Sequence, residues 1–126
     1  MNKTRKQEQE ELIKAEEKET IRLAERYNIP YKDLSQVSFS RELVQSFPAD
    51  FLHRLNFIPI EQNGDIVKIA IADPSDISTI DTIESFLGRK VEVYASSKRA
   101  IHEALRKSET ALQVLKDATE GFITPV

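Results

Sequence analysis

The sequence has 126 residues, of which 40% are hydrophobic and 31% are charged, which is enough for one domain with a full core. Its net charge of −3 argues against a nucleic-acid partner, and the absence of cysteine excludes disulfides, thiolate zinc sites and a cysteine nucleophile. No apolar run reaches the roughly 18 to 20 residues that span a bilayer, and the charged N-terminus lacks the apolar region of a secretory signal. We therefore expect a soluble, cytoplasmic protein with no direct membrane insertion.

The first 19 residues are almost entirely polar or charged and are rich in good helix formers. Residues 1–19 are therefore predicted to be a charged helical or disordered lead-in, with a partner-docking helix as the alternative. Apolar periodicity begins at residue 20, and one helix face is predicted to carry Thr20, Ala24 and Tyr27. Pro30 ends this helix, because the residue before a proline disfavours helical geometry, and residues 30–35 are predicted to run extended over the surface.

Two short helices are predicted next. Ser40 suits the N-cap of the first, because its hydroxyl can accept from a free amide of the first turn. Pro48 suits the first turn of the second. The buried side chains of the two helices are predicted to be Leu43, Val44, Phe47, Phe51, Leu52 and Leu55.

The period then changes from helix to strand. Residues 57–61 and 65–72 alternate as two strands, and Asn63-Gly64 between them predicts a type I′ hairpin turn. The second strand presents an entirely apolar face made of Val67, Ile69 and Ile71.

A helix over 77–87, a third strand over 90–94 and a last helix complete the pattern. Gly88 suits the end of the first of these helices, and Ser96 or Ser97 caps the last, whose apolar stripe through Leu112 and Leu115 continues to about residue 119. The predicted fold class is α+β, with a small mixed three-stranded sheet (a hairpin plus a β-α-β crossover) covered by helices.

Three carboxylates, those of Asp73, Asp76 and Asp81, lie within nine residues and raise the question of a metal site or acid–base chemistry. Asp73-Pro74 follows a strand, and Asp76 directly precedes a helix, where it is predicted to act as an N-cap. The spacing of a calcium loop is absent, although two carboxylates could still bind magnesium. We interpret the segment as a turn and a cap, with a small enzyme built on the three carboxylates as the minor alternative.

No other motif predicts catalysis. His53 and His102 lack metal-site spacing and are interpreted as surface histidines, and phosphate-binding loops and nucleophile elbows are absent from the sequence. The chain is therefore predicted not to be an enzyme by itself, and to have no catalytic residues, no metal and no cofactor.

The runs "LAERYNIPYKDLS", "FPADFLHRLNFIPI" and "IAIADPSDISTIDTIESFLGRKVEVYASSKRAIHEAL" resemble one known family. They are similar to the N-terminal domain of the type II secretion and type IV pilus assembly ATPases, which includes general secretory pathway protein E. The matched motifs keep their order and spacing over residues 20–119, and the segment 120–126 looks like a tail or the start of a linker.

The resemblance implies a bacterial, non-catalytic adaptor domain. Such a domain docks an ATPase, hexameric in its full-length form, onto the cytoplasmic domain of an inner-membrane platform protein, so it is cytoplasmic and peripheral to that membrane through its partner. ATP hydrolysis belongs to a separate downstream module in this family. The resemblance leaves the particular platform protein open.

Some relatives bind cyclic di-GMP through repeated "RLG..L...G" motifs, so a cyclic di-GMP-sensing domain is the alternative function. This sequence departs from the motif, because Ala24 follows Arg22-Leu23 where the motif has glycine, and there is no second copy.

A partner is expected to dock on exposed helix faces and loops, for which the segment 21–35 and the last helix are the candidates. Planar and cationic side chains are enriched among residues that dominate binding energy. The predicted partner-binding residues are Arg22, Arg26, Tyr31 and Lys32.

Overall fold

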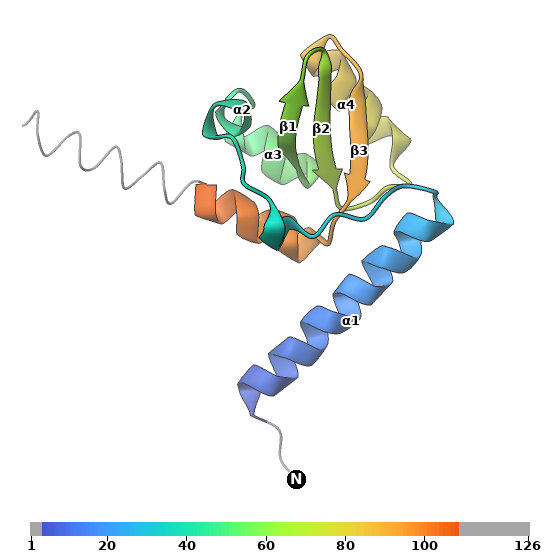
Figure 1. Cartoon of the computed structure of the whole chain (residues 1–126), viewed down its shortest axis with the longest axis vertical. Helices are drawn as coiled ribbons and strands as arrows, with labels where there is room; N and C mark the ends of the chain where they lie inside the picture. Colours follow the sequence, from blue (N-terminus) through green and yellow to red (C-terminus); the bar gives the residue numbers. More distant parts are fainter. Residues whose placement is uncertain (1–3, 109–126) are drawn as a thin grey trace, which may run out of the picture.

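The computed structural model describes residues 4–108, which form a small three-stranded sheet, the helices around it and a long N-terminal helix (Figure 1). The distal part of the predicted last-helix stripe, with Leu112 and Leu115, lies outside the described residues, as does the predicted segment 120–126.

Helix α1 spans Arg5–Arg26 and runs without a break through residues 19 and 20. Thr4 and Gln7 form a capping box at its start, which satisfies two free amides. Thr20 and Ala24 are buried as predicted, but Tyr27 lies at the C-cap and is 42% exposed, so its predicted place on the buried face is wrong. The Tyr27 amide still donates to the Leu23 carbonyl at 3.0 Å, and the helix ends at this exposed position.

The segment after α1 is only partly extended. Tyr31 forms an isolated parallel bridge with Ala95, and a 3₁₀ helix, η1, follows at Leu34–Gln36. The prediction of an extended surface run over 30–35 is therefore wrong in its second half. Asp33 caps the turn by accepting from the Ser35 amide at 3.0 Å, and the turn directs Leu34 into the core.

Helices α2 (Arg41–Gln45) and α3 (Ala49–Leu55) follow. The Ser40 hydroxyl accepts from the Leu43 amide at 3.3 Å, which confirms the predicted cap. Pro48 stands one position before the predicted one, at the N-cap of α3.

The sheet contains β1 (Phe57–Asn63), β2 (Ile66–Ile71) and β3 (Val91–Ala95), with β2 in the middle, antiparallel to β1 and parallel to β3. Asn63 pairs with Ile66, so the hairpin loop is Gly64 and Asp65. Among the described residues of this loop only Gly64, at φ +59°, has a positive φ. The predicted Asn63-Gly64 type I′ turn is therefore wrong by one residue, because a single glycine at the first loop position closes this hairpin.

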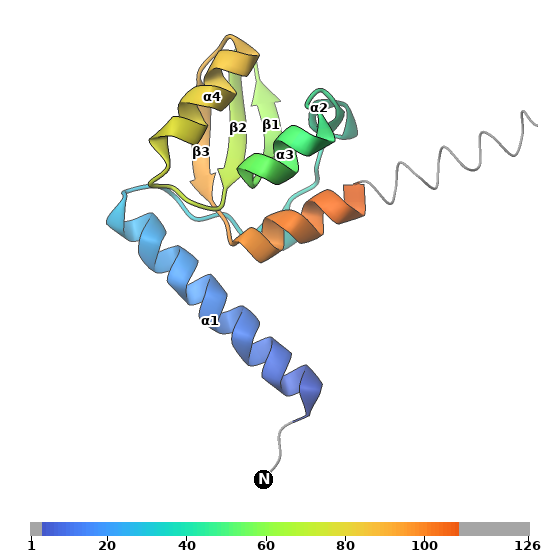
Figure 2. The same ribbon diagram turned by 180° about the vertical axis from the view of Figure 1, so that it is seen from behind.

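Helix α4 (Ile77–Leu87) connects β2 to β3 and ends at Gly88, at φ +67°, as predicted. Helices α3 and α4 lie on one face of the sheet, and a last described helix, residues 98–108, crosses one end of it (Figure 2). Ser97 caps that helix, since its hydroxyl accepts from the Ala100 amide at 3.1 Å. The predicted fold class, α+β with a small mixed sheet, is confirmed.

The core lies between the sheet and these helices. The fully buried face of β2 is the predicted one, with Val67, Ile69 and Ile71 at most 1% exposed. The other large, fully buried apolar side chains come from β1, α4 and the last helix: Phe57, Ile58, Ile83, Ile101 and Leu105.

Candidate partner-binding site

The carboxylates after β2 have structural roles. Asp76 accepts from the Thr79 amide at 3.0 Å and from the Thr79 hydroxyl at 2.7 Å, and these bonds lower the pKa of its carboxyl group. Asp73 accepts from the Ser75 amide at 3.0 Å and closes the preceding turn. In the part of the chain that the structure describes, no three His, Asp or Glu side chains gather as metal ligands. The turn and cap predicted for this segment are both present.

The four predicted partner-binding residues fall into two groups. Arg22 and Arg26 lie on α1 and Tyr31 and Lys32 lie beside β3, so the structure does not bring all four together. The Arg22 side chain is 78% exposed and lies 3.5 Å from Glu19, one turn away. Arg22 and Arg26 are therefore available to a partner only through the outer surface of α1.

Tyr31 connects α1 to the sheet. Its hydroxyl donates a hydrogen bond to the Glu17 carboxylate, and burial together with this negative neighbour raises the pKa of the Tyr31 phenol well above its ordinary value. The Tyr31 side chain is partly buried, so part of the ring is committed to holding α1 in place.

Lys32 is fixed mainly through its backbone. Its amide donates to the Ala95 carbonyl at 2.9 Å, and its own carbonyl accepts from the Ser96 hydroxyl at 2.7 Å. Its ammonium group lies 5.8 Å from the centre of the Tyr94 ring, a cation–π distance. The charge of Lys32 is thus held near the open side of β3.

Two acidic side chains of α1 contact the start of helix 98–108. Glu17 accepts from the Ser97 hydroxyl at 2.6 Å, and Glu16 accepts from the Arg99 amide at 3.3 Å. A helix N-terminus carries partial positive charge and free amides, so carboxylates are favourable there. These contacts could not be predicted from the sequence. The residues that form them are 80 and 83 positions apart, and neighbouring glutamates on a polar helix are usually exposed to solvent.

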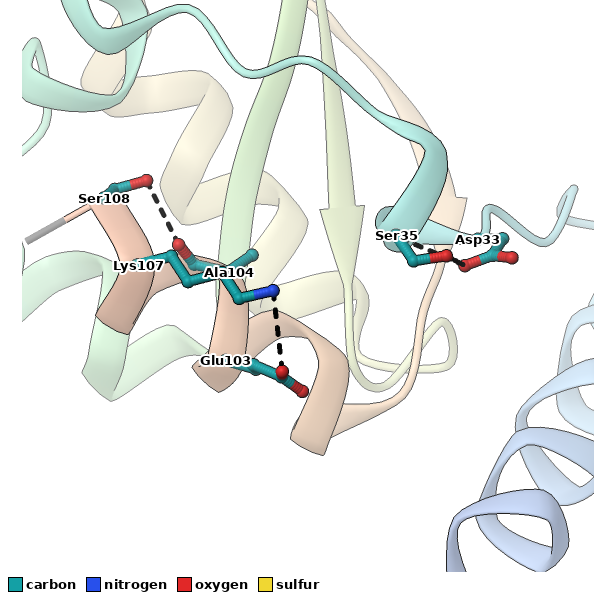
Figure 3. A network of polar contacts seen from close by, with 6 residues as sticks. All are labelled: Asp33, Ser35, Glu103, Ala104, Lys107 and Ser108. Atoms are coloured by element: carbon teal, nitrogen blue, oxygen red, sulfur yellow. Dashed lines mark hydrogen bonds and ion pairs between the residues drawn. The ribbon is translucent and has the colours of Figure 1, made fainter. Parts of the chain in front are cut away.

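A groove of about 390 Å³ lies between α1, the segment around η1 and helix 98–108. Its lining combines apolar side chains, which are Ile13, Leu34, Val37, Phe39, Ala100 and Ala104, with polar ones, which are Glu17, Tyr31, Asp33, Ser35, Arg99, Glu103 and Lys107. Figure 3 shows its two polar walls: Asp33 accepts from Ser35 on one side, and Lys107 lies 3.6 Å from Glu103 on the other. An apolar floor between charged walls suits an amphipathic segment of another protein.

The fold is that of known secretion-ATPase N-terminal domains. The structure of the N-terminal domain of XpsE matches with a TM-score of 0.65 at 21% identity, covering 72% of this chain and 64% of that one. The structure of MshE with cdg matches with a TM-score of 0.64 at 23% identity, covering 68% of this chain and 63% of that one. At these identities the structural match establishes the fold.

Residues 27–113 match the MshEN domain model, and the chain belongs to the MshEN domain family. It is 24% identical over 92 residues to the type IV pilus assembly ATPase PilB of Myxococcus xanthus, and 28% identical over 87 residues to PilB of Thermus thermophilus. These matches cover 73% and 68% of this chain. The chain spans only 16% and 10% of the length of these two relatives.

The family thus agrees with the resemblance seen in the sequence: this is a domain of the type found at the N-terminus of type II secretion and type IV pilus ATPases. The domain matched in XpsE is the N-terminal one. Among residues 4–108, no helix is long and apolar enough to cross a membrane.

Proposed function

We propose that this domain is a non-catalytic adaptor that docks a secretion or pilus-assembly ATPase onto the cytoplasmic domain of an inner-membrane platform protein. This places the protein in the cytoplasm, peripheral to the inner membrane through its partner. The observation that carries the proposal is the groove between α1 and helix 98–108, whose lining combines apolar and charged side chains and includes the predicted residue Tyr31.

The groove fits the requirements of a regulated, moderate-affinity contact. A protein partner needs apolar area for affinity and charged groups at the rim for orientation. Both are present within one concave surface, and Arg99 and Lys107 supply the cationic part of the rim. Arg22 and Arg26 lie on α1 outside the groove lining and add two cationic side chains to that helix.

The test measures binding of the cytoplasmic domain of the cognate platform protein to charge-reversed variants. Arg26→Glu, Tyr31→Ala and Lys107→Glu are expected to weaken binding about tenfold each, which corresponds to about 1.4 kcal/mol. Arg89→Glu is the matched control, because Arg89 follows α4 at the opposite end of the sheet from helix 98–108. Wild-type affinity in all three variants, with circular dichroism unchanged, would move the interface away from the groove.

Cyclic di-GMP sensing is the second candidate, and the fold shared with the structure of MshE with cdg is the observation that favours it. Two features of this chain oppose it, the lack of a second copy of the motif and the buried Ala24. Ala24, which replaces the motif glycine, is only 2% exposed, so its methyl group occupies the position where a ligand would need close backbone approach. Saturable binding of labelled cyclic di-GMP below about 10 μM, lost in Arg22→Ala, would establish this function instead.

A further inference from the structure

Two histidines meet where helix 98–108 packs against the end of α3. The ring centres of His53 and His102 are 6.0 Å apart, with 51° between the ring planes. His53 is exposed in the last turn of α3, whereas His102 is partly buried between the core residues Ile101 and Leu105 on the other helix. The pair therefore lies across a contact between two elements that are far apart in the sequence.

Asn56 fixes the orientation of the His102 ring. His102 Nε2 lies 2.7 Å from Asn56 Oδ1, and an amide oxygen only accepts, so Nε2 carries the hydrogen. Asn56 itself is held at φ 52° at the end of α3, and its carbonyl accepts from the Ala72 amide at 3.1 Å. In acid the second proton goes to Nδ1. The bond to Asn56 is kept in both states and supplies no negative charge.

The charges that act on the His102 ring are all positive. Lys98 and Arg106 lie one turn before and after it on the same helix, and His53 faces it from α3. Burial is the largest cause that lowers the pKa of His102 below its ordinary value of 6.5, and these cations lower it further.

Two other charged side chains on these helices are engaged elsewhere, and α3 also carries Asp50 in its first turn. Arg54 of α3 lies over the Phe51 ring, 5.9 Å from its centre. Glu103 pairs with Lys107, 3.6 Å away. Within the described residues, no carboxylate is therefore among the groups that act on the His102 ring.

We propose that His53 and His102 form a proton-sensitive joint between α3 and helix 98–108. While His102 is neutral, the helix packs on the domain through Ile101, Ala104 and Leu105. When the His102 ring takes up a proton, a cation forms at a partly buried position that Lys98, Arg106 and His53 already face, and helix 98–108 loosens from α3 to let it reach water. The response is local, because the pair touches this helix end and not the centre of the sheet.

The direction of the pH effect follows from the sign of the shift. A histidine whose pKa is lower in the folded protein favours folding in its neutral form. The stabilisation is complete above the unfolded value of 6.5 and is lost as pH falls from there toward the folded value.

The test is native-state amide hydrogen exchange of the whole chain at about pH 7.5 and about pH 5, corrected for the intrinsic pH dependence of exchange. Protection in helix 98–108 is expected to fall about tenfold more than protection of the β2 amides. An equal loss in both elements would overturn the proposal, because acid would then destabilise the whole domain.

Two variants assign the effect to the pair. His102→Gln keeps a neutral donor toward Asn56 and cannot become charged, so the selective loss in helix 98–108 is expected to disappear. His53→Gln removes one of the groups that lower the pKa of His102, so the selective loss is expected to become smaller. Lys90→Gln, which removes an exposed cation before β3, is the control and should respond like the wild type. Retention of the wild-type response in His102→Gln would overturn the proposal.

A measurement on the wild type covers the case in which His102→Gln fails to fold. The ring signals of both histidines are titrated by nuclear magnetic resonance together with the backbone amides. The amide shifts of helix 98–108 are expected to follow the midpoint of His102. Helix shifts that move at another pH, or do not move, would contradict a joint controlled by this ring.

Discussion

The sheet and helix α1 are held by different forces. In β2, Val67, Ile69, Ala70 and Ile71 are almost fully buried, and apolar burial stabilises the sheet. Helix α1 has 22 residues, yet only Thr20 and Ala24 are buried, and its contacts with the domain include the polar bonds of Glu16 and Glu17. Damage to the sheet should therefore unfold the whole domain, while damage to the polar bonds should release one helix.

The largest expected effect is on the sheet. Ile69→Ala removes a side chain that is 0% exposed at the centre of the core, and we expect a loss of about 2–4 kcal/mol through transfer energy and a cavity. Urea denaturation followed by far-ultraviolet circular dichroism measures it. Ile66→Ala is the control, because Ile66 lies on the same strand but is 51% exposed, and should cost much less. Equal losses in the two variants would mean that the buried face of β2 is assigned wrongly.

The second effect is on α1. Glu17→Ala removes the acceptor of the Tyr31 and Ser97 hydroxyls, and hydrogen bonds to a charged group contribute about 1.5–3 kcal/mol. We expect faster amide exchange in α1 with unchanged exchange in β2. The pKa of Tyr31 should also fall toward its ordinary value, since a negative neighbour is lost.

Glu19→Ala is the control for this experiment, because Glu19 lies on the same helix and its ion pair with Arg22, at 3.5 Å, stays within that helix. It should leave α1 exchange and the Tyr31 titration unchanged. Exchange that accelerates equally in α1 and β2 after Glu17→Ala would show that the two regions unfold as one unit, against the comparison drawn above.

The different forces also explain what the sequence predicts well. Apolar alternation in β2 and the Asp76 and Ser40 caps are local patterns, so the strand, the crossover helix and both caps follow from neighbouring residues. The hairpin loop lies one residue later than predicted. Asn63 pairs with Ile66 in the sheet, and this pairing overrides the local preference of Asn-Gly for the turn.

The candidate site is less predictable for the same reason. Tyr31 belongs to a segment that the sequence selects, but the groove also needs Glu17, Arg99 and Lys107. Arg99 and Lys107 come from a helix that follows the sheet, and no periodicity connects them to α1. Whether Arg22, Arg26, Tyr31 and Lys32 bind a partner stays a prediction.

A smaller effect is expected at the cap of α4. Asp76→Ala removes the acceptor of the Thr79 amide and hydroxyl, and we expect a fall of a few degrees in melting temperature. The pKa of Asp76 is lowered in the folded protein, so its contribution is present above the ordinary value near 3.8 and is lost as pH falls further. The melting temperatures of wild type and variant should therefore converge as pH falls below 3.8 toward the lowered pKa of Asp76.

Added magnesium or calcium provides the control for the role of Asp76. A turn and a cap bind no cation, so neither ion should raise the melting temperature of the wild type. A rise of several degrees that disappears in Asp76→Ala would assign the carboxylates to a metal site instead.

The smallest expected effect separates stability from binding. Arg22→Ala breaks a 3.5 Å contact with Glu19 in which both side chains are more than half exposed, and such pairs contribute less than about 0.5 kcal/mol. The free energy of unfolding and the exchange of α1 should both stay unchanged. Because the side chain contributes so little to folding, any loss of affinity for a platform protein in this variant reports a direct contact. A clear loss of stability would instead show that α1 depends on its outer surface, and that the polar bonds of Glu16 and Glu17 do not hold it alone.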